Sequence, residues 1–370
     1  MGGRALLVTL LGIMLLSTSV FYSITRSSAD LMKNVDRYYS RQSAQNLAQS
    51  GANLALQRLT KDRTWRQGYT LMTMFGGNIT VRLVDTTFKS KQVVKIVSTG
   101  ISDYGKSSER RESSTAYLPS GFIPAALKAA ISTNNPIRTL GNLNVDGRDH
   151  LSDGTLIPGS GTLGIWTTGT LSQSGSSTIG GNFSGVDYLP SKPGNANIIK
   201  TNQTWPGGYP GSPDSVLGGQ SQGFPEGSLK AIAQSGVGGS QYVTNPSVLS
   251  SPLRGVTYVE LPSGGLWQSM GITGSGILIV HNAAKNAGMK NLNSGTFTGL
   301  VIADDVVHIH TTIIGGLICL TSSPSEGNCI GNGSGDVLYS TQAISAATGT
   351  AGTPVANGNG SGNGVIAWWE

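Results

Sequence analysis

The chain begins with a long apolar run that nothing interrupts. From Ala5 to Thr25 there are 21 residues without a charge or a proline, and Arg4 and Arg26 flank them. A run of this length is sufficient to cross a bilayer as an α-helix. A cleavable secretion signal has a shorter apolar core, which is followed by a cleavage site of small residues and then by a different sequence pattern. Here the helical pattern continues, so the run predicts a helix that remains part of the protein.

Beyond Arg26 the pattern becomes amphipathic. The first proline is Pro119, so a helix is expected from Ala5 to about Leu59, roughly 80 Å long at 1.5 Å per residue. Small residues form a stripe on its second half, and small side chains allow helices to approach closely. Two interpretations are open: a membrane anchor with a stalk, or an assembly helix that packs against copies of itself. The residues expected at such an assembly face are Leu7, Leu11, Leu15, Ala44, Ala48, Ala52 and Ala55.

After the helix, apolar residues recur at every second position, as in a β-strand. The stretches "GNITVRLVDTT" and "KQVVKIVSTGISDYGKSSERRESSTAYL" alternate apolar and polar residues, which predicts a small antiparallel meander from Tyr69 to Leu118. Farther on, short apolar pieces alternate with Gly, Asn, Ser and Thr. The most apolar pieces are about 20 residues apart, and this spacing favours the coils of a parallel β-helix over a β-sandwich with long loops. These pieces are Ile277–Val280, Leu300–Ala303 and Leu317–Leu320.

The patterns together predict an α+β protein in four parts. We expect a helix over 1–60, an antiparallel β unit over 61–119, a Gly-rich β-helix-like domain over 120–347 with a Pro-rich insertion at 190–225, and a flexible linker with an apolar C-terminal strand over 348–370. The stretch "PEGSLKAIAQSG" predicts a short helix with Ser228 as its N-cap. The ending "VIAWWE" is expected to dock, because an apolar strand left free is a template for aggregation.

Charge and composition narrow the class of protein. Charged residues make up 12% of the chain, about half the usual fraction, and the 53 glycines are about twice the usual share. Residues 1–70 contain nine Lys and Arg against three Asp, which accounts for the whole net charge of +6. The basic character therefore belongs to the helical stalk. A nucleic-acid-binding surface requires Lys and Arg clustered on the folded body, so no nucleic-acid partner is expected.

Two groups of side chains are weak candidates for metal ligands. His308 and His310 in "DDVVHIH" share one face of a strand, near Asp304 and Asp305. The alternative is a polar outer face of a coil. The stretch "DGRDHLSDG" places three aspartates in a turn-rich loop without the spacing of a calcium hand, and aspartates are also common turn residues. These aspartates are Asp146, Asp149 and Asp153.

No catalytic arrangement is apparent, and neither enzymatic activity nor a cofactor is expected. The glycine turns lack the lysine of a phosphate loop, and no serine elbow or HExxH pattern is present. Cys319 and Cys329 are expected to form a disulfide in an oxidising compartment. Asn-x-Ser/Thr sequences make five asparagines possible glycosylation acceptors: Asn78, Asn182, Asn202, Asn332 and Asn359.

Several stretches in order resemble one family. The apolar run with its amphipathic extension, above all "SAQNLAQSGANLALQRL", resembles type IV pilin-like proteins of the minor-pilin and pilus-assembly branch. The alternating segment that follows is similar to the small strand unit of those proteins. The stretches "NVDGRDHLSDG", "SLKAIAQSG", "GSGILIVH" and "AWWE" resemble the Gly-rich β domain often fused to it.

The resemblance implies an exported, inner-membrane-anchored precursor that assembles through its N-terminal helices into an extracellular filament at the cell surface. The implied partners are copies of the chain, other pilins and the pilus assembly machinery. Only Met1 to Arg4 precede the apolar run, so we expect the mature form. Major pilins carry a glutamate near the start, whereas "MGGRALLVTL" has no acid. A minor or tip pilin, or a membrane-anchored monomeric adhesion protein, therefore remains an alternative to a main filament subunit.

Overall fold

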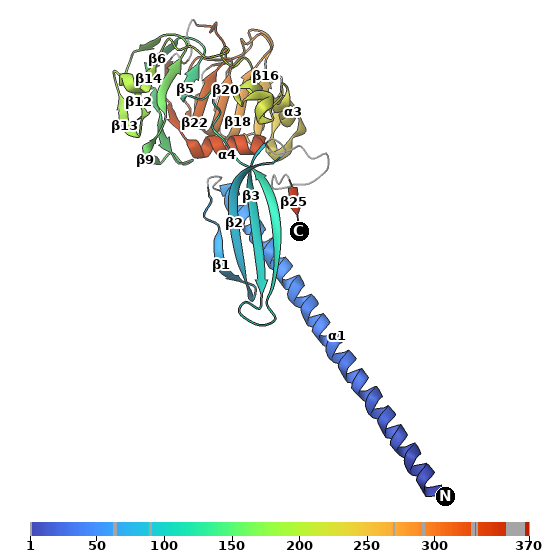
Figure 1. The fold of residues 1–370 in the computed structure, drawn as a ribbon. Coiled ribbons are helices and arrows are strands. Elements are labelled where there is room, and N and C mark those ends of the chain that lie inside the picture. Colours follow the sequence, from blue (N-terminus) through green and yellow to red (C-terminus); the bar gives the residue numbers. More distant parts are fainter. Residues whose placement is uncertain are drawn as a thin grey trace.

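The computed structural model describes residues 2–61, 65–88, 91–268, 271–290, 293–326, 330, 332–352 and 367–369, of which 2–5, 60–61, 91–92, 332 and 367–369 are described in their backbone alone. Three parts follow one another: a long helix, a small sheet packed against its C-terminal end, and a large β body beyond the sheet (Figure 1). The α+β prediction holds at this level, with an apolar N-terminal helix and a mainly β body of several sheets.

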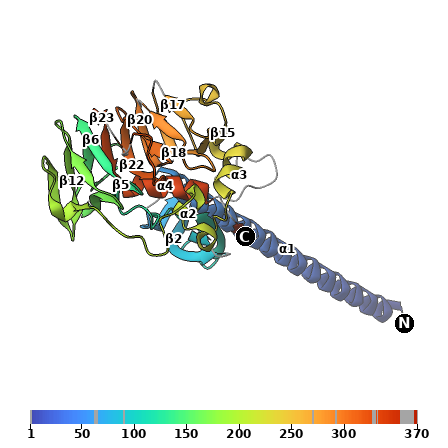
Figure 2. The ribbon, with the colours of Figure 1, turned by 90° about the horizontal axis from the view of Figure 1, so that it is seen from above.

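The first helix, α1, spans Gly2–Lys61. Its 60 residues correspond to about 90 Å at 1.5 Å per residue. All described side chains from Leu6 to Tyr39 are exposed, and a buried face begins only at Ser40. The N-terminal part of the helix therefore projects away from the rest of the chain, as both ribbon views show (Figures 1 and 2).

The small sheet is the meander that the alternating pattern predicts. Its strands pair antiparallel in chain order: β1 (Tyr69–Met74), β2 (Gly77–Phe88), β3 (Lys91–Ser102) and β4 (Arg110–Pro119). A fifth strand, β25 (Ala367–Trp369), adds antiparallel to the edge of β4, with Trp368 opposite Ala116. The C-terminal strand thus docks on its own chain, as expected, and it does so at the meander.

The C-terminal third of α1 packs closely on this sheet. A Cβ atom on Gly100 of β3 would come within 2.0 Å of the Ala44 carbonyl oxygen and 2.5 Å of the Ala48 nitrogen. Glycine at this position therefore permits direct contact between the two backbones. The shared core contains Leu47, Ala55, Leu56, Leu59, Ile79, Val81, Ile96, Ala116 and Leu118.

The largest sheet of the β body has twelve strands, most of them parallel to their neighbours. Its N-terminal half consists of β5 (Ala129–Thr133), β7 (Asn144–Asp146), β10 (Leu163–Thr167), β12 (Thr178–Phe183), β13 (Val186–Ser191) and β14 (Ile199–Lys200). Its C-terminal half consists of β15 (Gln241–Val243), β16 (Val256–Glu260), β18 (Gly274–His281), β20 (Thr296–Ala303), β22 (Thr312–Cys319) and β24 (Asp336–Tyr339).

The order of strands in this sheet differs from their order along the chain. In the N-terminal half, β5 pairs with β10 and β10 with β14, each partner lying 34 residues farther along. The chain then resumes at the opposite end with β15 and returns through β16, β18 and β20 to β22. There Leu317 of β22 pairs with Ile131 of β5. The two halves of the body therefore meet in its middle.

A column of glycines runs through three neighbouring strands. Gly276, Gly299 and Gly315 lie opposite one another in β18, β20 and β22, with φ of +120°, +140° and +148°. A Cβ on Gly299 would lie 2.0 Å from the Gly276 carbonyl oxygen, and one on Gly315 would lie 1.7 Å from that of Gly299. Only glycine fits this column, because the backbones touch there and φ is positive.

Smaller elements complete the body. One parallel sheet consists of β6 (Ile137–Gly141), β11 (Leu171–Gln173) and β23 (Asn332–Gly333). A second consists of β17 (Leu266–Gln268), β19 (Gly288–Lys290) and β21 (Asp305–Val306). The strands β8 (Arg148–His150) and β9 (Leu156–Gly161) form an antiparallel hairpin. The short helices are η1 (Ala196–Ile198), α2 (Pro213–Val216), η2 (Gly219–Gln222), α3 (Ser228–Ser235), η3 (Val237–Gly239) and η4 (Pro246–Val248). The helix expected in "SLKAIAQS" is thus present, although Gly227 occupies its N-cap.

The last helix, α4 (Thr341–Ala351), crosses β18, β20 and β22 and faces the meander (Figure 1). The buried Thr348 hydroxyl accepts the Phe122 N–H at 2.9 Å and donates to the Phe122 carbonyl at 2.8 Å. This contact ties the body to the segment that follows β4. The expectation of a linker from residue 348 is wrong at its start, because α4 continues to Ala351.

Candidate functional site

The exposed apolar part of α1 is the most unusual surface of the chain. Leu7, Leu11 and Leu15 are 67%, 57% and 64% exposed, and no described part of the chain covers them. The helix includes an 18-residue window of mean hydropathy 2.0, so by length and composition it can cross a membrane. A signal sequence shares these properties, so the finding establishes the capacity for anchoring and no more.

Three hydroxyl groups in this segment form hydrogen bonds within the helix. The hydroxyls of Thr18, Ser23 and Thr25 donate to helix carbonyls three or four residues earlier, at 2.8–2.9 Å. A hydroxyl bonded in this way enters an apolar environment without leaving an unpaired donor. The segment is therefore compatible with lipid or with a bundle of apolar helices.

The alanine stripe of α1 packs against a different partner than expected. Ala44, Ala48, Ala52 and Ala55 are at most 1% exposed, because they face the meander of the same chain. The expectation that these four residues contact neighbouring helices is corrected: the close packing they permit is intramolecular. The three leucines of the expected assembly face do remain exposed.

Asp146 of the candidate calcium loop belongs to a buried ion pair. Its carboxylate accepts from the Arg148 guanidinium, with Oδ1 3.0 Å from Nε and Oδ2 2.6 Å from Nη2. Both side chains are almost fully buried, at 3% and 11% exposure. His150 lies 3.7 Å from the same carboxylate, and its Nδ1 is 3.1 Å from the Tyr339 carbonyl oxygen. This arrangement joins the hairpin β8–β9 to the main sheet.

The other two aspartates of the loop accept hydrogen bonds from backbone N–H groups. Asp149 accepts the Thr341 N–H at the start of α4 at 2.8 Å. Asp153 accepts the Thr155 N–H at 2.8 Å, and this hydrogen bond lowers the pKa of Asp153. Among the described residues, no group of three or more His, Cys, Asp or Glu side chains is arranged to hold a metal ion. The calcium interpretation therefore has no geometric support in that part of the chain.

The two histidines near residue 309 do lie together, with ring centroids 6.5 Å apart. His310 Nδ1 is 2.8 Å from the Ser334 hydroxyl, and burial lowers the pKa of His308. The neighbouring carboxylates are committed elsewhere: Asp304 bonds His281 Nδ1 at 2.6 Å, and Asp305 accepts from Ser325. These side chains do not assemble into one ligand set.

Cys319 ends β22 and is fully buried. Cys329 lies outside the described residues, so the disulfide remains a prediction.

Three of the five candidate glycosylation asparagines are described with their side chains. Asn182 is 6% exposed and its amide donates to Asp187 at 2.7 Å, so it is not accessible to a transferase in the folded chain. Asn78 is half-buried and its amide donates to the Leu71 carbonyl, whereas Asn202 is exposed. The Asn332 side chain and all of Asn359 lie outside the described part.

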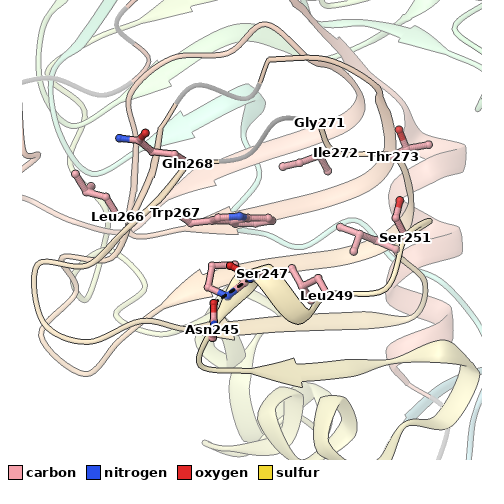
Figure 3. A pocket seen from close by; sticks show the side chains of 12 residues that line it. Asn245, Ser247, Leu249, Ser251, Leu266, Trp267, Gln268, Gly271, Ile272 and Thr273 are labelled. Carbon is pink, nitrogen blue, oxygen red and sulfur yellow. Dashed lines mark hydrogen bonds between the residues drawn. The ribbon is translucent and has the colours of Figure 1, made fainter.

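A pocket of about 590 Å³ lies at the β15 end of the body and was not expected from the sequence. Figure 3 shows the Trp267 ring in its middle, with residues of η4 on one side and of the 271–273 loop on the other. Its lining comes from three separate segments, 245–253, 266–268 and 271–273. Such a site has no contiguous motif, because folding brings the segments together.

Comparisons of the chain with protein-family models, with curated proteins and with solved structures find no match.

Proposed function

We propose that the chain is a structural subunit of a type IV pilus-like extracellular filament. Polymerisation occurs through the N-terminal part of α1, and the β body is displayed outside. The exposed apolar segment from Leu6 to Ile24 carries the proposal. Burying one large apolar side chain gains about 1.5–3 kcal/mol, so a segment with this many requires lipid or other helices around it.

The same segment supports the proposed route. A single apolar helix in which Thr18, Ser23 and Thr25 bond to helix carbonyls suits an inner-membrane-anchored precursor. From this precursor the assembly machinery transfers the subunit to copies of itself or to other pilins. The basic residues from Arg26 onward then lie at the membrane surface before assembly. The meander and the body are held at the far end of the helix (Figure 1).

For the body, the finer assignment that we propose is a parallel β-helix-like stack. Support comes from the in-register parallel pairing of β16, β18, β20 and β22 and from the glycine column across the last three of these strands. Parallel strands stacked over successive coils produce both features.

A membrane-anchored monomeric surface protein, or a minor tip pilin, is the second candidate. It is favoured by the absence of any acidic residue before Asp30, since the resemblance implies a carboxylate near the start that pairs with a neighbouring subunit. The two candidates differ in whether α1 contacts α1 along a continuous polymer.

Cross-linking tests this difference. The double variant Leu11→Cys/Ile13→Cys places thiols on opposite sides of the helix, so neighbouring helices in a filament yield disulfide-linked ladders longer than dimers after oxidation. The double variant Val186→Cys/Leu189→Cys, at two exposed residues of β13, is the matched control and should give no ladder. Fibres sheared from the cell surface and identified by mass spectrometry should contain the chain. Its recovery from detergent-extracted membranes alone, without ladders, would contradict the filament.

A further inference from the structure

The pocket around Trp267 combines an apolar floor with a polar rim. Leu253, Trp267 and Ile272 form the floor and are 5%, 8% and 2% exposed. The rim consists of exposed polar side chains (Figure 3): Asn245, Ser247, Ser251, Gln268 and Thr273. A volume of about 590 Å³ lies within the range of small-molecule sites.

Several polar groups of the rim are available to form hydrogen bonds with a ligand. Asn245 Oδ1 accepts the Ser247 N–H at 3.0 Å, which caps the start of η4. Figure 3 marks no other hydrogen bond between the pocket residues. The Gln268 amide and the Ser251 and Thr273 hydroxyls have no partner within the described part of the chain. These donors and acceptors surround one aromatic ring.

Among the described residues that line the pocket, none has a charged side chain. A phosphate, an acidic sugar or a cation would therefore find no counter-charge at this site, and desolvating its charge would be unfavourable. A ligand that suits the site is neutral, offers several hydroxyl or amide groups to the rim, and has an apolar face for the floor.

We propose that this pocket binds a neutral oligosaccharide. A pyranose has a face of C–H groups that packs on an indole ring, and its edge carries hydroxyls that exchange hydrogen bonds with amides and hydroxyls. The apolar side chain of a protein partner would use the floor alone and would leave the rim groups unpaired, which is unfavourable on desolvation. The site is independent of filament assembly.

The test uses the purified full chain in detergent micelles and an array of neutral glycans. The array contains oligomers of glucose, galactose, mannose and N-acetylglucosamine, together with acidic glycans and apolar peptides. We expect at least one neutral glycan to bind, and Gln268→Ala and Thr273→Val each to weaken binding about tenfold, as expected for one lost hydrogen bond. Gln220→Ala, at an exposed glutamine of η2, is the matched control and should bind normally.

Trp267→Phe tests the contribution of the apolar floor alone, because it keeps an aromatic side chain in the core but offers the ligand a smaller ring. Binding should weaken, and the loss of core volume should also lower the urea unfolding midpoint, whereas Gln268→Ala and Thr273→Val change exposed residues and should leave the midpoint near that of the parent chain. The proposal is overturned if no neutral glycan binds, if only acidic glycans bind, if apolar peptides bind in place of glycans, or if Gln268→Ala and Thr273→Val bind like the parent chain.

Discussion

At the scale of single residues, the glycine column is the least tolerant feature of the body. Gly299→Ala forces a Cβ toward the Gly276 carbonyl oxygen and an L-residue into φ +140°. Backbone strain of about 1–3 kcal/mol and overpacking of about 1–3 kcal/mol both oppose folding. We expect a loss of about 2–6 kcal/mol in urea unfolding followed by tryptophan fluorescence.

The control for this substitution is Gly264→Ala, which changes a glycine with φ +71° and open space around its Cβ position. It introduces the backbone strain without the collision, so its loss should stay near 1 kcal/mol. Equal losses in the two variants would show that close backbone contact is not what requires glycine at position 299.

The Glu260 carboxylate gives the body a defined acid sensitivity. It accepts from Lys230 Nζ at 2.6 Å and from the Tyr242 hydroxyl at 2.5 Å. These hydrogen bonds, that of Lys230 first, hold the pKa of Glu260 below its ordinary 4.5. Because the folded-state pKa is depressed, the stabilisation is present above pH 4.5 and disappears as the pH falls through the folded value.

Glu260→Gln should therefore lower the free energy of unfolding by about 0.5–1 kcal/mol at pH 7, a small value because the pair is about one-third exposed. The difference from the parent chain should vanish as the pH falls well below 4.5. A double-mutant cycle with Lys230→Gln isolates the pair. A difference that stays constant with pH would exclude this ionisation as its origin.

At the scale of elements, the two halves of α1 have separate roles. Ala48 is buried against Gly100 of β3, so Ala48→Leu should separate the helix from the meander and cost about 1–3 kcal/mol. Ala29→Leu makes the same change on the exposed part of α1 and should leave stability unaltered. Hydrogen exchange of the meander amides measures both. Equal protection in the two variants would contradict close helix–sheet packing.

The sequence predicts an element well where the residues of that element alone determine its structure. The unbroken helix, the meander and the short helix α3 follow from local periodicity and the absence of proline. The alanine stripe was placed against the wrong partner, because small residues indicate close packing without indicating what lies opposite. The start of α3 differs by one residue, since Gly227 at φ +87° provides its N-cap and Ser228 bonds back to the Pro225 carbonyl.

The candidate site was predicted less well than the elements. The exposed leucines of α1 follow directly from the hydrophobic run, whereas Trp267 and Gln268 resemble ordinary strand residues in the sequence. Their chemistry depends on η4 and the 271–273 loop, which only the folded body places nearby. Asp146, in contrast, suggested a metal ligand because the sequence does not reveal that Arg148 turns back to pair with it.

At the scale of the whole molecule, the sheet order was beyond the reach of sequence patterns. The 34-residue offset of the N-terminal half and the shorter offsets of the C-terminal half belong to two different repeats. The contact that unites them joins residues 186 positions apart, as in the hydrogen bond from the Asn135 amide to the Thr321 carbonyl. Local periodicity contains no information about such a pairing.

This arrangement bears on how the chain is completed while it is being synthesised. The ribosome produces β5 long before β22, so one edge of the early strands waits without its neighbour until residue 319 has emerged. The free edge of β22 is covered by both β5 and β24, and β24 in turn pairs with the early strand β7. A nascent chain that ends before β22 leaves this edge of β5 without its partner, and an unpaired strand edge readily pairs with other chains. The large sheet therefore becomes continuous only late in synthesis, when β22 and β24 join the early strands.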